Sequence, residues 1–333
     1  TYYLVEGSGS EHTPLDGEQM VLENEFFKVE VDRDSGAIRS IYDKKTGRFV
    51  TKAFRHEATR PEFSNLFQVL YEAPHGMSAW IIGPITRVKN LLTGAEVELV
   101  RKGPVMSKIK TSRKYRNSII MQEILLYAGV PRIDFNTMID WQEASDEFTE
   151  APMLKVSFSP ILDSPVATFE IPFGSISRIA DGREFPALRW IDLSDGGYGV
   201  SLLNDCKYGF DVNGNTMRMT ILRTSYSPDP NPDQGHHELK YSLYPHTGDW
   251  RKDLAFRKGY ELNHPLETVV VTTRMSQGNL PEEASFLRIK PENIVLSCLK
   301  LAEDSDDVII RIYDATGEGG EAELALGVPV TEA

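Results

Sequence analysis

Apolar and polar residues alternate with a period of two along most of this chain, and no other feature constrains its fold as strongly. From Phe27 to Asp32, apolar residues alternate with charged ones, as in a strand that buries one face and exposes the other. The triplet 34–36 (Asp-Ser-Gly) then has turn chemistry, and 37–42 has the pattern of a returning strand. The same pattern recurs at 97–100, 105–110, 118–127, 133–141, 154–158, 167–171, 199–204, 217–222 and 238–244.

The spacing of these segments predicts an all-β fold. Short strands with few helical stretches between them are typical of an antiparallel sandwich or barrel, not of alternating strand–helix units. One segment, 249–260, departs from the pattern. Asp249 is suited to a helix N-cap, and Trp250 and Leu254 are four residues apart, so we predict a short helix that ends near Asn263.

The C-terminal part of the chain has its own organisation. The stretch 276–283 contains Gly, Pro and charged residues and has the composition of a connector. Beyond it, 294–301, 307–313 and 321–326 have the pattern of strands in a terminal sheet. We therefore predict a large β-domain over 1–270 and a terminal β-sandwich element over 271–333.

Net charge restricts the class of partner. The 333 residues include 36 Lys and Arg against 49 Asp and Glu, a formal net charge of −13. An acidic surface repels phosphate groups, so we expect neither nucleic acid nor an anionic membrane as a partner. No apolar run approaches the roughly 18 residues that a membrane-spanning helix needs.

Cysteine content and the start of the chain suggest a location. Cys206 and Cys298 both lie in apolar, strand-like contexts, and two cysteines in 333 residues do not form a disulfide framework. We predict that both thiols are buried, in a reducing compartment. No signal segment follows Thr1, so we expect a piece of a longer polypeptide that lies in the cytoplasm of a prokaryote.

The familiar catalytic motifs are absent: no P-loop, GxGxxG opening a helix, HExxH, CxxC or GxSxG occurs. The densest polar stretch is 204–249, which combines carboxylates, amides, imidazoles and aromatic rings. Sugars need such a set, because polar groups bind their hydroxyls and rings cover their C–H faces. The competing interpretation is structural, with the proline-aspartate run 228–233 as a rigid turn whose Asp side chains cap their own backbone.

Three other residues have both a structural and a functional interpretation. His237 follows His236, and neighbouring strand residues point to opposite faces, so at most one of them could join a metal site, and we predict none. We expect Trp80 to pack in the core, with a sugar-stacking platform as the alternative. For His246, between Pro245 and Gly248, a structural hydrogen-bonding role and a role in a binding site are equally well supported.

Several segments together resemble a known family. The segments 22–29 and 36–44 are similar to the opening of the C-terminal β region of glycoside hydrolase family 38 α-mannosidases. The most specific matches are the proline-aspartate run with His237 and the segment 244–250. Further matches occur, in the family's order, at 132–135, 140–143, 169–174, 199–209, 292–297 and 299–304.

The resemblance implies a fold and a division of labour. Enzymes of this family are retaining α-mannosidases with an Asp nucleophile, a second carboxylic acid and a zinc ion that holds sugar hydroxyls. Those groups lie on an N-terminal barrel, and no His-x-Asp zinc motif occurs here. We therefore expect no catalytic residue and no zinc ligand in this chain, which should fold as a large antiparallel β-supersandwich, galactose-mutarotase-like, with a smaller terminal β-sandwich.

The resemblance also implies partners and site residues. The β region should complete the rim of the pocket for a mannose-containing oligosaccharide, against the N-terminal catalytic barrel of the same polypeptide. An apolar patch at that contact would favour self-association into a homo-oligomer. The stretch 204–214 should carry the rim contacts, with Asp205, Lys207, Tyr208 and Asp211 as first candidates. Second candidates are Asp229, Asp233, His237 and His246.

Two rival functions remain open. One is a carbohydrate-binding β-sandwich that acts without a hydrolytic partner. The other is a mutarotase-like epimerase, which uses a His and a carboxylate on a similar sandwich, although fold analogy alone is weak support.

Overall fold

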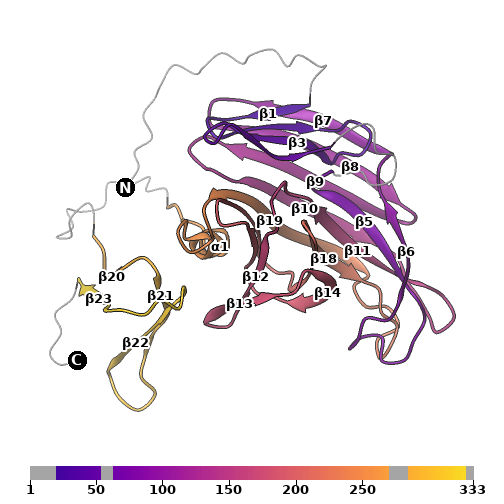
Figure 1. Cartoon of the computed structure of the whole chain (residues 1–333). Coiled ribbons are helices and arrows are strands. Elements are labelled where there is room, and N and C mark those ends of the chain that lie inside the picture. Colours follow the sequence, from indigo (N-terminus) through magenta and orange to yellow (C-terminus); the bar gives the residue numbers. More distant parts are fainter. Residues whose placement is uncertain (1–19, 54–62, 270–283, 328–333) are drawn as a thin grey trace. The chain divides into compact units, whose positions relative to one another are not determined.

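A computed structural model describes residues 20–53, 63–269 and 284–327 (Figure 1). The described residues divide into two compact units, the larger within 20–170 and 176–263, the smaller within 171–175, 264–269 and 284–327. The boundary predicted near residue 270 lies outside the described residues. Within the described part, no helix is long and apolar enough to cross a membrane.

The larger unit is built on antiparallel sheets of nine, six and four strands. The nine-stranded sheet has the order β13 (Gly174–Arg178), β12 (Val166–Ile171), β15 (Trp190–Ser194), β16 (Tyr198–Asn204), β19 (Gly235–Thr247), β10 (Ile133–Trp141), β9 (Ser118–Tyr127), β8 (Met106–Tyr115), β7 (Ala95–Lys102). The six-stranded sheet has the order β14 (Asp181–Pro186), β17 (Gly209–Asn213), β18 (Thr216–Arg223), β11 (Ala151–Phe158), β5 (Leu66–Glu72), β6 (Ile85–Asn90). The four-stranded sheet runs β1 (Val21–Glu23), β2 (Phe27–Val31), β3 (Ile38–Asp43), β4 (Arg48–Lys52). The predicted all-β supersandwich is confirmed.

The smaller unit contains two antiparallel pairs of strands. β20 (Leu287–Lys290) pairs with β23 (Glu323–Leu326), and β21 (Ile294–Leu301) pairs with β22 (Val308–Asp314). The sequence predicts β21, β22 and β23, at 294–301, 307–313 and 321–326, but it does not predict β20.

The large sheets share one core because alternate residues of each strand face inward. In β2, Phe27, Val29 and Val31 are buried, whereas Lys28 and Glu30 are only half-buried. The long strands β8, β9 and β10 run side by side in Figure 1. Between the sheets, the Phe135 ring of the nine-stranded sheet lies 5.8 Å from the Phe158 ring of the six-stranded sheet, edge to face.

The helix differs from the prediction. α1 spans Ala255–Asn263 and therefore begins later than Asp249. The Asp249 carboxylate accepts hydrogen bonds from the backbone N–H groups of Arg251 and Lys252, each at 3.1 Å, and so caps a turn. Leu254 follows with a φ of 53°, which a right-handed helix does not allow, so helical structure starts only after it.

Two predictions of burial are wrong. Trp80 is 64% exposed, because it lies on a loop that leaves the sheet. Cys206 is exposed and Cys298 is half-buried, since both lie where the apolar pattern of their strands ends against a turn or an open face.

Candidate functional site

The residues predicted to bind sugar lie in three separate regions of the larger unit. Asp205, Lys207 and Tyr208 are in the turn between β16 and β17, and Asp211 is on β17. The other four are in the loop before β19 or on that strand. His237 and His246 stand near opposite ends of β19, about 30 Å apart at roughly 3.4 Å per residue. The eight residues therefore do not form one pocket.

The turn 205–208 is fixed from three elements. The Asn204 side chain donates to the Leu188 carbonyl at 2.7 Å and accepts from the Lys207 N–H at 2.6 Å. Its own carbonyl accepts from Asn263 Nδ2, at the end of α1, at 2.9 Å. Asp205 exchanges two hydrogen bonds with the backbone of Lys240 on β19, at 3.1 and 3.0 Å. The turn is thus a rigid platform.

What the platform presents is polar and accessible. Tyr208 is 55% exposed and Lys207 is half-buried. Asp205 Oδ1 is buried and has no hydrogen-bond partner within the described residues. Partial desolvation of the sulfur within the turn and the neighbouring Asp205 raise the pKa of the Cys206 thiol to about 12, so the thiol stays protonated and is a poor nucleophile. The chemistry available here is hydrogen bonding and stacking.

Asp211 belongs instead to a buried charge cluster on the six-stranded sheet. Its carboxylate accepts from Lys155 Nζ at 2.7 Å and from Arg218 Nε at 2.7 Å. Lys155 also donates to Glu184, which in turn accepts from Thr220. The side chains of Lys155 and Asp211 are only 2% and 1% exposed. All of Asp211's oxygens are used, so the structure gives it a role in holding the sheet.

The proline-aspartate loop fits the structural interpretation of the sequence. Asp229 Oδ1 accepts the Asn231 N–H at 3.0 Å, as in an Asx turn. His237 Nε2 lies 2.7 Å from the Asp233 carbonyl oxygen, and the Asp233 backbone has a φ of 60°. These contacts close the loop on itself, as the structural interpretation expects.

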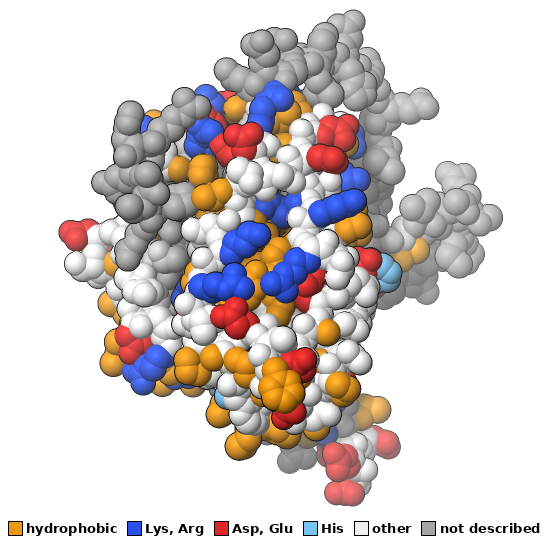
Figure 2. Space-filling view, turned by 90° about the vertical axis from the view of Figure 1, so that its right-hand side faces the viewer, with side chains coloured by type: hydrophobic (Ala, Val, Ile, Leu, Met, Phe, Trp, Pro, Cys, Tyr) orange, Lys and Arg blue, Asp and Glu red, His pale blue; other side chains and the backbone are white. Residues whose placement is uncertain are grey.

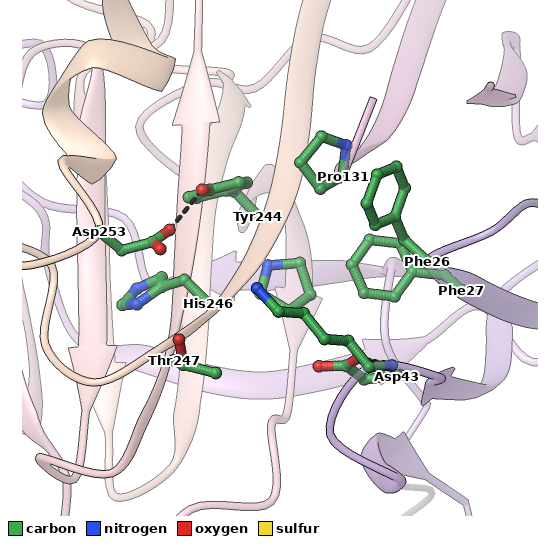
Figure 3. Close-up of a pocket in the computed structure, with 10 residues that line it drawn as sticks. Phe26, Phe27, Asp43, Pro131, Tyr244, His246, Thr247 and Asp253 are labelled. Carbon is green, nitrogen blue, oxygen red and sulfur yellow. Dashed lines mark hydrogen bonds between the residues drawn. The ribbon is translucent and has the colours of Figure 1, made fainter. Parts of the chain in front are cut away.

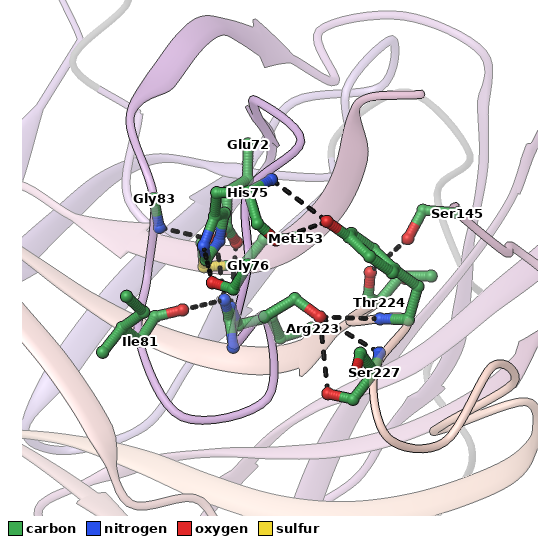
Figure 4. Close-up of polar contacts among 12 residues, drawn as sticks. Glu72, His75, Gly76, Ile81, Gly83, Ser145, Met153, Arg223, Thr224 and Ser227 are labelled. Carbon is green, nitrogen blue, oxygen red and sulfur yellow. Dashed lines mark hydrogen bonds and ion pairs between the residues drawn. The ribbon is translucent and has the colours of Figure 1, made fainter. Parts of the chain in front are cut away.

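A charged network that the sequence did not indicate anchors the loop between β5 and β6 (Figure 4). Arg223 on β18 donates to both oxygens of Glu72, at 2.9 and 2.6 Å, and the Gly83 N–H donates to Glu72 at 2.6 Å. His75 Nε2 also contacts Glu72. Burial alone would raise the pKa of Glu72, but these donors outweigh burial and lower it. The carboxylate is therefore kept charged.

The anchored loop carries an exposed apolar tip. Met77, Trp80, Ile81 and Ile82 are 60%, 64%, 53% and 42% exposed. Large apolar side chains gathered on a firmly held loop mark a surface that contacts another molecule or another part of the polypeptide.

A pocket of about 120 Å³ lies at the other end of β19 (Figure 3). Its lining residues come from four turns and the strand end: Phe26, Phe27, Asp43, Lys45, Pro131, Tyr244, Pro245, His246, Thr247 and Asp253. Tyr244 Oη donates to Asp253, as the dashed line in Figure 3 shows. Behind the pocket, His246 Nε2 lies 2.8 Å from Asp192 Oδ1, and both side chains are fully buried.

The Asp192–His246 pair couples stability to pH. Burial alone would lower the pKa of His246, but the hydrogen bond and charge of Asp192 outweigh it and raise the pKa above the usual 6.5. Folding therefore favours the imidazolium. The contribution of the pair is fully present below pH 6.5 and is lost as the pH rises through the raised pKa.

We expect the free energy of unfolding to fall more steeply over that alkaline interval in the wild-type chain than in His246→Gln, which cannot titrate. Urea unfolding at a series of pH values measures both slopes. Equal slopes would show that the imidazole has the same pKa in the folded and unfolded chains.

Two further properties of the described residues bear on ligand binding: the charges on the surface and the grouping of possible metal ligands. On the face in Figure 2, several basic side chains gather near the middle, with acidic side chains beside them. Among the described residues, no three His, Cys, Asp or Glu side chains gather in a way that could hold a metal ion.

Comparisons with known proteins identify the family of the chain. The family described as "Glycosyl hydrolases family 38 C-terminal domain" matches residues 22–231, and "Glycosyl hydrolases family 38 C-terminal beta sandwich domain" matches residues 293–333. The chain is 36% identical over 228 residues to human Alpha-mannosidase 2C1, covering 65% of this chain and 21% of that protein. It is 26% identical over 314 residues to Alpha-mannosidase G of Dictyostelium discoideum, covering 90% of this chain and 27% of that protein.

A solved structure agrees in fold. A protein of glycosyl hydrolase family 38 from Enterococcus faecalis superposes with a TM-score of 0.76 at 17% identity, over 97% of this chain and 41% of that chain. The chain spans 21% of the length of human Alpha-mannosidase 2C1 and 27% of the length of Alpha-mannosidase G.

Proposed function

Because this chain belongs to glycoside hydrolase family 38 and matches the family's C-terminal domain, we propose that it is the carbohydrate-binding β-region of a retaining, zinc-dependent α-mannosidase. The enzyme would hydrolyse terminal α-mannose of an oligosaccharide. The α-mannosidase relatives and the small share of their length that this chain spans support the proposal. The resemblance to the family that the sequence predicts is confirmed.

In the proposed division of labour, the nucleophile, the acid and the zinc ligands come from an N-terminal catalytic barrel of the same polypeptide. Retaining hydrolysis needs two carboxyl groups about 5–5.5 Å apart beside the sugar. Asp211 is engaged in a buried ion pair at 2.7 Å, and the described residues offer no metal cluster. On this proposal the chain by itself is inactive.

The turn 205–208 carries the proposed rim role. It is held rigidly from β15–β16, β19 and α1, yet it presents Tyr208, 55% exposed, and Lys207 toward solvent. A preorganised turn loses little entropy when a sugar binds, and its phenol and amine match a sugar's face and hydroxyls. The apolar tip at Trp80 supports a contact with the rest of the polypeptide.

The alternatives have less support. A mutarotase-like epimerase would need a His and a carboxylate open to the sugar, whereas His246 and Asp192 are both fully buried. Two free cysteines without a disulfide support the cytoplasmic, prokaryotic location that we propose with this function.

The proposal is tested in the longer polypeptide with an aryl α-mannoside. We expect Lys207→Ala and Tyr208→Ala each to raise KM about tenfold, the effect of losing roughly 1.4 kcal/mol of binding. Lys240→Ala is the matched control, because only the backbone of Lys240 contacts the turn. The 333-residue chain alone should give no turnover. Turnover by the chain alone, or unchanged KM in both variants, would contradict the proposal.

A further inference from the structure

The pocket at the end of β19 is distinct from the proposed rim. The turn 205–208 is bonded to β19 at Lys240, whereas the pocket is lined by Tyr244 and Thr247 on the same strand. Four to seven residues of strand separate them, which is roughly 14–24 Å. A ligand of monosaccharide size cannot contact both places, so the pocket needs its own explanation.

Its polar groups differ in kind and converge on one opening. Asp253 uses one carboxylate oxygen for Tyr244 Oη, so its other oxygen can accept a further hydrogen bond. Lys45 and Thr247 are exposed, and within the described residues their amine and hydroxyl make no hydrogen bond to protein. The pocket therefore offers an acceptor, a cationic donor and a hydroxyl.

One wall of the pocket is apolar. Figure 3 shows Phe26, Phe27 and Pro131 on the side opposite to Tyr244, His246 and Asp253. His246 Nδ1 is buried without a hydrogen-bond partner among the described residues. An unpaired buried polar atom costs about 1–3 kcal/mol, which favours a polar ligand or water on the His246 side of the pocket.

The charges decide between classes of ligand. Asp43 and Asp253 would repel an anion, and the Lys45 ammonium would repel a metal cation. Asp43 is already satisfied, since it accepts from Tyr198 Oη at 2.7 Å and from the Lys45 N–H at 2.8 Å. A neutral molecule with several hydroxyls and an apolar face suits what remains. A volume of about 120 Å³ leaves room for a small ligand such as one sugar ring.

We propose that this pocket is a second carbohydrate site, which binds one neutral pyranose through Lys45, Thr247 and Asp253 with its C–H face against Phe26 and Pro131. The site goes beyond the proposed function, because it needs neither the rim turn nor a catalytic partner. It would hold a sugar residue of a glycan whose cleavage takes place elsewhere.

Saturation-transfer NMR on the 333-residue chain with methyl α-D-mannopyranoside tests this. We expect transfer to the sugar ring protons, at least fivefold weaker binding in Lys45→Met and Thr247→Val, and unchanged binding in Lys110→Met, an exposed lysine on β8. Both pocket substitutions keep the approximate size of the side chain and remove no side-chain hydrogen bond within the described part of the chain. Circular dichroism checks that each variant is folded.

Three outcomes would overturn the site: no transfer to the sugar, transfer that is equal in all variants, or displacement of the sugar by inorganic phosphate. The first would show that the pocket binds no pyranose, the second that the sugar binds elsewhere, and the third that the pocket selects anions. None of them depends on mannosidase activity, so a failure here is distinguishable from a failure of the proposed function.

Discussion

Replacing Asp211 with alanine should lower the free energy of unfolding by about 3–5 kcal/mol, the usual effect of removing one partner of a buried ion pair. Lys155 is 2% exposed and would lose a partner at 2.7 Å, and Arg218 would lose another at 2.7 Å. Lys155 would then keep only Glu184 among these partners, in a largely desolvated setting. Urea unfolding followed by tryptophan fluorescence measures the change.

Asp181→Ala is the matched control on the neighbouring strand β14. Asp181 pairs with Arg183 at the exposed edge of the same sheet, so this variant should unfold at the wild-type urea concentration. If Asp211→Ala is as stable as the control and instead raises KM in the longer polypeptide, the carboxylate contacts sugar, and its assignment to the fold is wrong.

Replacing Glu72 with alanine should release the loop between β5 and β6 and destabilise the chain by about 3–5 kcal/mol. Glu72 is 2% exposed and accepts from Arg223 twice and from the Gly83 N–H. Without it, Arg223 keeps only the Ile81 carbonyl among these partners, at 2.5 Å. Limited proteolysis should then cut near Trp80 faster than in the wild-type chain.

Glu150→Ala controls for loss of an acid from this region, because Glu150 pairs with Arg87, which is 51% exposed. It should leave the cleavage rate unchanged. Glu72→Gln keeps a hydrogen-bond acceptor, so its cleavage rate should lie between those of Glu150→Ala and Glu72→Ala. Wild-type cleavage rates in Glu72→Ala would mean that the loop is held by its other contacts, such as those of Tyr226 and Ser78.

Strands with one buried face could be predicted from the sequence. β9 and β10 lie at the bounds that the alternation indicates, Ser118–Tyr127 and Ile133–Trp141. β5 and β15 were missed, because nearly every residue in them is buried and a strand with two buried faces has no alternation to detect. Helix α1 was displaced because the N-cap chemistry of Asp249 also suits a turn.

The candidate site was predictable only in part. The turn 205–208 was selected because polar residues end a strand there, and the structure shows it held and accessible. Asp211 has the same local sequence character, yet it faces Lys155, a residue 56 positions earlier in the chain. Glu72 and Arg223 are 151 positions apart, so neither segment by itself indicates that the two side chains pair.

The sequence by itself determined the all-β class, most strand positions and membership of the family, because alternation and motifs are properties of a few consecutive residues. The tertiary structure alone decided that Asp211 is buried and that Trp80 is exposed. The physical reason is that burial and charge pairing depend on which strands lie side by side, and the sheets join segments that are distant in the sequence.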